Sequence, residues 1–324
     1  MRVAVLMGGR SGEHDVSLVS GAAVVGALTR LGREAWPLTF GRDGRASWPG
    51  GEGPLVGGLA AMMAVAVDVA FVAMHGAEGE DGRVQGALEL LGVPYQGSDV
   101  AASAVCLDKL RTKQVYEAAS LPVARDVRIH RGDRWDAEQI AAELGLPVVV
   151  KTAESGSSVG VEVVATHEEL AARIEALLAE SAALVCETWL PGREFTCAVL
   201  ERGAGSAEAL PLIEIRPRDG RFFDYQTKYD PDAVDEICPA AVDEALGAEM
   251  RALGERAHKA LGCRDYSRTD IKLDAAGRPH LLETNTLPGL TAASLMPKAA
   301  AAAGLGFDAL IAHLCDRAFA RRRG

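Results

Sequence analysis

The chain has 324 residues with a formal net charge of −11, and 48% of the residues are hydrophobic. The length predicts two or three globular domains, and the excess of acidic residues argues against non-specific nucleic-acid binding. The sequence contains no apolar run of about 18 residues, so no membrane-spanning helix is predicted.

The first part of the chain alternates between strand and helix patterns. Strands are predicted at residues 3–7 and 67–73, and helices at residues 20–31 and 86–91. Such alternation indicates a parallel sheet covered by helices, so we assign an α/β domain to residues 1–105.

Two α+β modules are predicted to follow, at residues 106–200 and 201–324. The first should contain strands at 147–151, 159–164, 184–187 and 195–200 and a helix at 167–181. The second should contain strands at 209–216, 270–274 and 280–283 and helices at 243–261 and 307–317. It also includes an irregular, aromatic-rich segment at 221–231, and a loop of that length is more often functional than idle.

The six cysteines are widely separated, and no two of them form a C-x-x-C pair. Neither a zinc site nor a redox motif is therefore predicted. Reduced, mostly buried thiols are typical of cytoplasmic proteins, which predicts a cytoplasmic location. The apolar N-terminus is too short for a signal peptide and leads into Gly8, so we interpret it as the first strand.

A group of polar residues near the C-terminus is predicted to share one face of a hairpin. A two-residue tip at 276–277 would place Asp270 opposite Glu283 and Arg268 opposite Asn285. Residues two apart share a face of a strand, so all four side chains would project from one side.

Two carboxylates and an amide placed side by side are costly unless a positive charge neutralises them. Oxygen ligands suit Mg²⁺, which commonly keeps room for phosphate oxygens, and two such ions can bridge carboxylates to a nucleoside triphosphate. On spacing alone, a solvated polar face or simple pairing of Asp270 with Arg268 stays an open alternative to metal binding.

Three turn-rich segments are candidates for ligand binding. Gly8 and Gly9 follow the first strand, but the loop matches neither G-x-G-x-x-G nor a P-loop, so a nicotinamide-binding domain is not indicated. A ligand loop and a tight turn stay equally open there. His75 lies in another turn after a buried strand and could contact a substrate or cap a helix.

The third segment, residues 151–160, joins two predicted strands. Its glycines would let backbone N–H groups approach an anion, and Ser157 and Ser158 would add hydroxyl donors. Lys151, at the end of a buried strand, is a point charge suited to phosphate. An anion cradle and a flexible surface hairpin are both compatible with this sequence.

The order of the motifs along the chain resembles the D-alanine–D-alanine ligase family of ATP-grasp enzymes. The matching motifs are Gly12-Glu13-His14-Asp15-Val16-Ser17, His75-Gly76, Gly79-Glu80-Asp81-Gly82, Asp108-Lys109, Lys151, Gly156-Ser157-Ser158-Val159-Gly160, Lys228-Tyr229, Arg268-x-Asp270 and Glu283-x-Asn285-Thr286-x-Pro288-Gly289. Each motif alone is loose, but their order and spacing are specific and span nearly the whole chain. The resemblance implies an N-terminal substrate-binding domain followed by two α+β lobes that clamp ATP.

The resemblance also implies residues that bind ATP and its metal ions. The ATP-binding set is Lys109, Lys151, Ser158, Glu187, Trp189, Leu190 and Glu194. Within it, Glu187 would lie near the adenine and Glu194 near the ribose. Two Mg²⁺ ions, for which Mn²⁺ can substitute, would be held by Asp270, Glu283 and Asn285.

A further set of residues is implied for the amino-acid substrates. The catalytic residues would be Glu13, Ser157, Tyr229, Arg268, Gly289 and Ser294, and the substrate-binding residues His75, Lys228 and Leu295. Glu13 would hold the ammonium group of the first D-alanine, with hydrogen bonds linking it to Ser157 and Tyr229. Arg268 and the N–H of Gly289 would form an oxyanion hole. The second substrate's carboxylate would lie at the N-terminus of a predicted helix, which favours anions.

The activity implied is ATP-dependent joining of two D-alanines through an acyl-phosphate, for peptidoglycan precursors, in a cytoplasmic homodimer. Segment 221–231 would close over the site as a lid, and its Tyr229 resembles members that form the dipeptide instead of an ester with D-lactate. Thr152 and Gln226 depart from the family pattern, which has proline and an acidic residue there. The alternatives are an ATP-grasp ligase that makes an ester or a specialised dipeptide, and a nucleotide-binding protein without catalysis.

Overall fold

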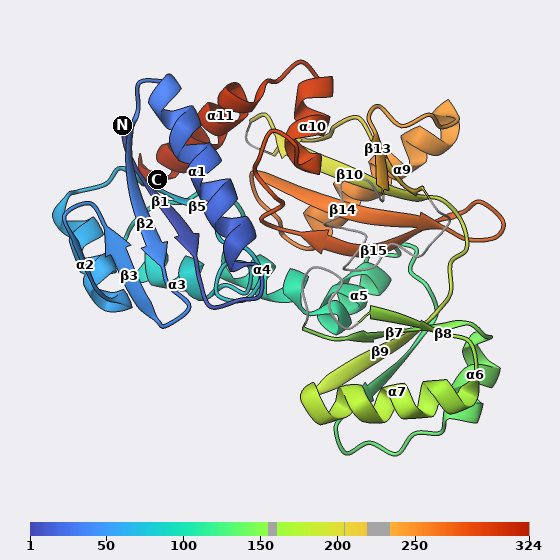
Figure 1. Cartoon of the computed structure of the whole chain (residues 1–324). Helices are drawn as coiled ribbons and strands as arrows, with labels where there is room; N and C mark the ends of the chain where they lie inside the picture. Colours follow the sequence, from blue (N-terminus) through green and yellow to red (C-terminus); the bar gives the residue numbers. More distant parts are fainter. Residues whose placement is uncertain (155–160, 204, 219–233, 324) are drawn as a thin grey trace.

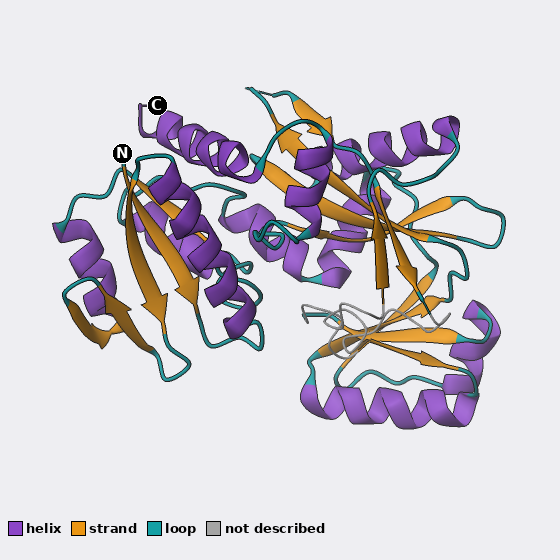
Figure 2. Cartoon of the chain, turned by 45° about the horizontal axis from the view of Figure 1, so that its top comes forward, coloured by secondary structure: helices purple, strands orange, loops and turns teal. Residues whose placement is uncertain are grey.

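The computed structural model describes residues 1–154, 161–203, 205–218 and 234–323. Three sheets occupy successive parts of the chain, and helices cover each of them (Figure 1). The N-terminal sheet lies to one side, and the other two sheets face the centre of the molecule from above and below, as Figure 2 also shows. The predicted irregular segment at 221–231 lies outside the described residues.

The N-terminal sheet has the strand order β4-β3-β2-β1-β5. Its strands are β1 (Arg2–Gly8), β2 (Glu34–Phe40), β3 (Arg45–Trp48), β4 (Gly51–Pro54) and β5 (Val69–Val72), and its helices are α1 (His14–Arg30), α2 (Leu55–Ala64) and α3 (Arg83–Leu90). The predicted parallel pairing is confirmed for β1 with β2 and β5, whereas β3 pairs antiparallel with both β2 and β4. β1 is buried on both faces beyond Arg2, as is typical of a parallel strand covered by helices.

The middle sheet is antiparallel, with the order β6-β9-β7-β8. Its strands are β6 (Asp126–His130), β7 (Val148–Thr152), β8 (Val161–Val164) and β9 (Ala183–Thr188), and its helices are α6 (Ala137–Leu144) and α7 (His167–Glu180). The two helices pack against one face and form a separate core with it. The opposite face is therefore left to build the site.

The third sheet has the order β13-β12-β10-β14-β15, with β11 beside β10. Its strands are β10 (Glu194–Glu201), β11 (Ala207–Ala209), β12 (Ile213–Pro217), β13 (Val234–Ile237), β14 (Tyr266–Leu273) and β15 (Pro279–Asn285). Helices α4 (Val100–Leu107), α5 (Lys109–Ala118) and α9 (Glu244–Ala260) cover one face. A Cβ on Gly254 of α9 would come 2.5 Å from the sulfur of Cys197, so only glycine lets α9 lie this close to β10.

The C-terminal helices α10 (Leu295–Ala302) and α11 (Phe307–Ala320) return to the N-terminal domain, and a short 3-10 turn, η1 (Arg321–Arg323), follows. α11 packs against α1, and Arg33, three residues after the end of α1, pairs with Asp316 of α11 at 2.8 Å. Within the described ranges no single helix is long and apolar enough to cross a membrane, although α10 and α11 pass that test as a bent pair.

Several element limits differ from the sequence prediction. α1 begins at His14, six residues before the predicted start at 20. The strand predicted at 209–216 is divided into β11 and β12. The strand predicted at 195–200 as part of the middle module pairs instead with β12 and β14 in the third sheet. The domain limits at residues 105 and 200 stay a prediction.

The β14–β15 hairpin has the predicted register at the site but not the predicted tip. Arg268 pairs with Asn285, and Asp270 with Glu283, whereas nearer the turn the register shifts by one residue, with Ile271 opposite Leu281. The tip is not the predicted two-residue loop, because Asp274 N–H bonds to the carbonyl of residue 278 and leaves three residues between them. The third loop residue has a left-handed φ of +79°, which glycine supplies. A bulge at residue 282 restores the register at the site.

Candidate active site

One pocket collects side chains from all three parts of the fold. The N-terminal domain contributes Glu13, Val16, His75 and Glu80, and the middle lobe contributes Val149, Lys151, Val161, Glu187, Thr188, Trp189 and Leu190. The third sheet contributes Glu194, Ile215, Glu236, Arg268, Asp270, Lys272, Leu282, Glu283 and Asn285, and the segments after β15 contribute Leu287, Pro288, Gly289, Thr291, Ala293, Ser294 and Leu295. Lys109, at the start of α5, completes the lining.

Every predicted site residue that the structure describes lines this pocket. These residues are Glu13, His75, Lys109, Lys151, Glu187, Trp189, Leu190, Glu194, Arg268, Asp270, Glu283, Asn285, Gly289, Ser294 and Leu295. Ser157, Ser158, Lys228 and Tyr229 lie outside the described residues, as does Gln226. The chain thus brings together residues that are up to 282 positions apart, from 13 to 295.

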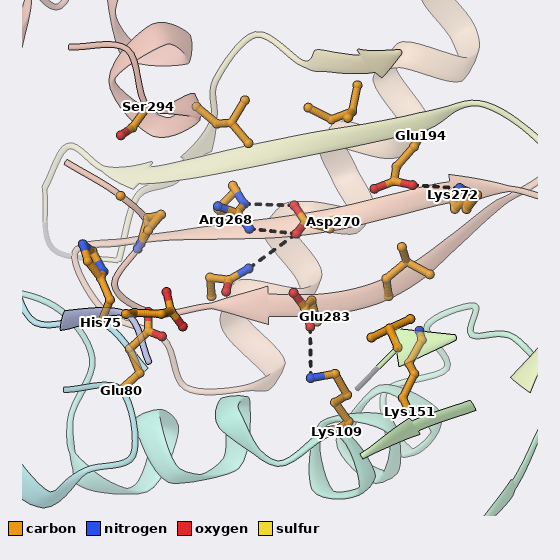
Figure 3. A pocket seen from close by; sticks show the side chains of 18 of the residues that line it. His75, Glu80, Lys109, Lys151, Glu194, Arg268, Asp270, Lys272, Glu283 and Ser294 are labelled. Atoms are coloured by element: carbon orange, nitrogen blue, oxygen red, sulfur yellow. Dashed lines mark hydrogen bonds and ion pairs between the residues drawn. The ribbon is translucent and has the colours of Figure 1, made fainter. Parts of the chain in front are cut away.

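The row of polar side chains on β14 and β15 forms the centre of the pocket (Figure 3). Arg268 donates two hydrogen bonds to Asp270, at 2.9 and 2.8 Å, and Asn285 donates one at 3.5 Å. Thr196 donates a further bond of 2.7 Å to Asp270. Burial would lower the pKa of Arg268, but the charge of Asp270 outweighs it and raises that pKa above its ordinary value. The simple pairing of Asp270 with Arg268 is therefore present.

Lys109 lies across the pocket from this row and pairs with Glu283 at 3.4 Å. The preceding residue, Asp108, caps α5 by accepting hydrogen bonds from the N–H groups of residues 110 and 111. The N–H of Lys109 bonds to the carbonyl of Ala153 at 2.9 Å. The cap and this bond hold the lysine between the two lobes.

Lys151 on β7 is paired with Glu187 on the neighbouring strand β9, with 2.5 Å between the charged atoms. The other oxygen of Glu187 accepts a bond of 2.7 Å from Lys113. Burial would raise the pKa of Glu187, but the two lysines together lower it to about 2. The resemblance implied that Glu187 lies near the adenine, and here its carboxylate also fixes Lys151 in the pocket wall.

Lys113 was not predicted, although a signal for it was present. It lies four residues after Lys109, so both lysines project from the same side of α5. Lys272 was also missed, although it lies two residues after Asp270 and so continues the polar face of β14. Lys272 pairs with Glu194 at 2.7 Å and lies 5.3 Å from the ring centre of Trp189.

The N-terminal domain places two carboxylates close together, on either side of Gly76. The N–H of Gly76 bonds to Glu80 at 3.0 Å, and a Cβ added to Gly76 would come 3.1 Å from an oxygen of Glu13. Burial and the charge of Glu13 raise the pKa of Glu80 to about 8. The pair therefore holds a proton near neutral pH.

His75 lies beside these carboxylates at the end of the pocket, and it is 3% exposed. One ring nitrogen lies 2.9 Å from the hydroxyl of Ser20, and the other lies 3.0 Å from the carbonyl of Leu287. The imidazole thus contacts the middle of α1 and does not cap a helix. Of the two interpretations of His75, the geometry therefore supports the pocket residue over the helix cap.

Ser294 immediately precedes α10, as predicted. Its hydroxyl accepts a hydrogen bond of 3.1 Å from the N–H of Thr291 and caps no amide of the helix. A Cβ added to Gly289 would come 2.9 Å from this hydroxyl, so a larger residue at this position would displace the Ser294 side chain. The N-terminus of α10 thus lies at one end of the pocket, where it favours an anion.

The pocket lies between two α+β lobes and is lined by lysines, carboxylates and apolar side chains. This arrangement is the site of an ATP-grasp enzyme. The family models agree in detail. Residues 115–316 match the "D-ala D-ala ligase C-terminus" and residues 54–98 the "D-ala D-ala ligase N-terminus". The chain belongs to the D-alanine–D-alanine ligase family.

Curated relatives and solved structures support the same assignment. The D-alanine–D-alanine ligase of Desulfotalea psychrophila is 43% identical over 326 residues, which covers 100% of this chain and 97% of the relative. That of Chromohalobacter salexigens is 43% identical, covering 97% and 93%. The Bacillus anthracis ligase complexed with ATP has a TM-score of 0.82 at 29% identity, covering 100% of this chain and 99% of that one. The Coxiella burnetii ligase has a TM-score of 0.84 at 27% identity, covering 100% and 95%.

Proposed function

We propose that this enzyme joins two D-alanine molecules to D-alanyl-D-alanine, with ATP converted to ADP and phosphate through a D-alanyl-phosphate intermediate. The observation that carries the proposal is the pocket itself, because every described member of the predicted site lines it. The full-length similarity to D-alanine–D-alanine ligases supports the reaction and its role in peptidoglycan precursor synthesis.

ATP would bind between the two lobes. The base fits the apolar recess that Val149, Leu190 and Leu282 line, beside Trp189. The phosphates fit the end of the pocket where the lysines project from α5 and β7. Lysine is a point charge suited to phosphate, and two such charges offset the repulsion when the phosphoryl group approaches a carboxylate.

Asp270, Glu283 and Asn285 fit a site for Mg²⁺, because they offer only oxygen ligands and lie together on one face of the hairpin. Bound there, Mg²⁺ would offset negative charge on the phosphates during transfer. Arg268 and Lys109 neutralise the two carboxylates in the structure described here. We propose that two ions bind there and that Mn²⁺ can substitute for Mg²⁺.

The amino acids would bind at the end of the pocket near the N-terminal domain. Glu13, beside Glu80, is placed to hold the ammonium group of the first D-alanine. Phosphorylation of the carboxylate of this first D-alanine makes its carbonyl carbon electrophilic. The amine of the second D-alanine attacks that carbon, and phosphate leaves. The tetrahedral oxyanion would form near the guanidinium of Arg268 and the N–H of Gly289, where fixed donors act most strongly.

The second D-alanine would bind with its carboxylate toward Ser294 and Leu295, at the N-terminus of α10. Lys228 and Tyr229 are proposed to complete this side of the site. Ester formation with D-lactate, or a specialised dipeptide, is the alternative product. Tyr229 favours the dipeptide on sequence grounds.

We further propose a homodimer in the cytoplasm. All six cysteines are free, which supports a reducing compartment. Light scattering coupled to gel filtration measures the oligomeric state, and a monomeric mass at micromolar concentration would contradict the dimer.

The test of the function is product identification by mass spectrometry with ATP, Mg²⁺ and a panel of D-alanine, L-alanine and D-lactate. We expect the dipeptide with D-alanine, no product with L-alanine, and no ADP release when a chelator removes divalent ions. Equal ADP release with L-alanine would reject the stereochemical assignment. D-alanyl-D-lactate as the main product would favour the alternative.

A further inference from the structure

Lys272 is a charged pocket residue that neither the motifs nor the proposed mechanism uses. It lies directly opposite Glu194 in the antiparallel pairing of β14 with β10. Its ammonium nitrogen is 2.7 Å from Glu194 Oε2, and the two side chains are only 13% and 15% exposed. An ion pair this sheltered restricts the orientation of the carboxylate more than an exposed one does.

A second contact holds Lys272 from the other side. Its ammonium group lies 5.3 Å from the ring centre of Trp189, at a distance suited to a cation–π interaction. Lys272, Glu194 and Trp189 therefore form one group at the nucleotide end of the pocket (Figure 3 labels Lys272 and Glu194). Lys272 continues the polar face of β14 two residues beyond Asp270, and none of the three residues is among the proposed metal ligands.

A second cation, Lys151, also lies within the electrostatic range of Glu194. Burial lowers the pKa of Lys151, and the carboxylates of Glu187, Glu283 and Glu194 outweigh burial and raise it. Glu194 is thus near enough to interact with the phosphate-binding lysine. The direct ion pair with Lys272 holds this carboxylate away from Lys151, at the nucleoside end of the pocket.

We propose that Lys272 is a positioning residue that holds Glu194 for the ribose hydroxyls and so sets the preference of this enzyme for ribonucleotides over deoxyribonucleotides. The inference rests on the proposed function, in which Glu194 lies near the ribose. A carboxylate has about four lone-pair sites, so one bond from Lys272 leaves room for hydroxyl donors. A bond from a hydroxyl to a charged acceptor is worth enough to change affinity about tenfold.

The experiment measures binding of ADP and of 2′-deoxy-ADP by calorimetry, with Mg²⁺ and without amino acid. The wild type should bind ADP about tenfold more tightly than 2′-deoxy-ADP, and Lys272→Met should reduce this ratio to about twofold. In turnover assays the same variant should raise KM for ATP about tenfold and leave kcat near the wild-type value, because Lys272 touches no reacting group. Lys272→Arg should keep most of the discrimination.

Lys259→Met is the matched control, since it removes a lysine charge from an exposed position on α9. It should change neither the ratio nor KM. If Lys272→Met did not fold, Lys272→Gln and Glu194→Gln would carry the same comparison, each with a reduced ratio expected.

Three outcomes would overturn the inference. One is an unchanged ratio in the Lys272 variants, which would leave the pair only as a cross-strand contact that stabilises the sheet. Another is a wild type that binds both nucleotides equally. The third is a wild type that binds neither nucleotide, and only this outcome would reject the proposed function as well.

Discussion

Glu80 shows how a single side chain in this pocket responds to its surroundings. The pocket wall shields it in part from water, and Glu13 lies just beyond Gly76. Both effects favour the protonated carboxyl, so its pKa rises from the ordinary 4.5 to about 8. The motif containing Glu80 was recognised in the sequence, but its protonation depends on a neighbour 67 positions away, which no local pattern reveals.

The stability of the protein should therefore depend on pH through Glu80. Between pH 4.5 and about 8 the folded state keeps a proton that the unfolded state has lost, so stability falls as pH rises through this window. The slope is at most about 1.4 kcal/mol per pH unit. Glu80→Gln should remove this slope in urea titrations from pH 5 to 9. Parallel pH curves for Glu80→Gln and the wild type would contradict the assignment, and the exposed Glu208→Gln serves as control.

At the scale of elements, the β14–β15 hairpin brings the site together through two irregularities that offset each other. The loop has one residue more than predicted, and the bulge adds one residue on β15. The predicted pairing of Asp270 with Glu283 is thus correct, but it depends on the longer loop and on the bulge, neither of which was predicted. Leu282 and Glu283, although adjacent, both line the pocket.

Deletion of Thr284 should abolish ligase activity. It places Asn285 opposite Thr269 instead of Arg268, and a one-residue slip turns the side chain to the opposite face. We expect ADP release to fall by about 1,000-fold, as when groups that stabilise a transition state are lost. Deletion of Ala276 in the loop is the control, because the register at Asp270 need not change. Substantial activity in a folded Thr284 deletion would show that this register is dispensable.

Other elements could not be predicted from the sequence, and the physical reason can be given for each. β2 alternates between buried and partly exposed residues, but Pro37 in its middle opposes a strand assignment, because proline lacks an N–H for the ladder. β10 has the pattern of any buried strand, so nothing local indicates which sheet it joins. Long buried strands such as β1 were predictable because their composition alone identifies them.

At the scale of the whole molecule, one buried carboxylate joins the N-terminal domain, the third sheet and the C-terminal end. Asp265 accepts hydrogen bonds from Arg317 at 2.8 Å, from Arg321 at 2.7 Å and from the N–H of Gly97 at 2.8 Å. Its side chain is 0% exposed. Burial would raise the pKa of Asp265, but the arginines outweigh burial and lower it. The stabilisation is present above the ordinary carboxyl pKa and is lost as pH falls below it.

Asp265→Asn should destabilise the protein by about 3 kcal/mol, because the partly buried Arg317 and Arg321 lose the charged acceptor that they share, although Arg317 keeps its pair with Glu201. This corresponds to a fall in Tm of roughly 5–10 °C in thermal denaturation. Asparagine tolerates the left-handed φ of +63° at this position, so the variant isolates the charge. Turnover at low temperature should stay near the wild-type level. Asp316→Asn, which breaks the more exposed pair with Arg33, should change Tm little, and an equal loss from both variants would argue against a special role for Asp265.

The cations that line the pocket are already bound to carboxylates before any substrate arrives. Lys109, Lys151, Arg268 and Lys272 are paired with Glu283, Glu187, Asp270 and Glu194. At Lys109 and Lys151 we expect nucleotide binding to exchange partners, so that phosphate oxygens take the place of Glu283 and Glu187, whereas Lys272 keeps Glu194. A divalent ion bound by the released Glu283 would complete the exchange, so nucleotide and metal should each increase the affinity of the other. The pocket can thus stay nearly neutral when empty and still accept a highly charged substrate when both arrive.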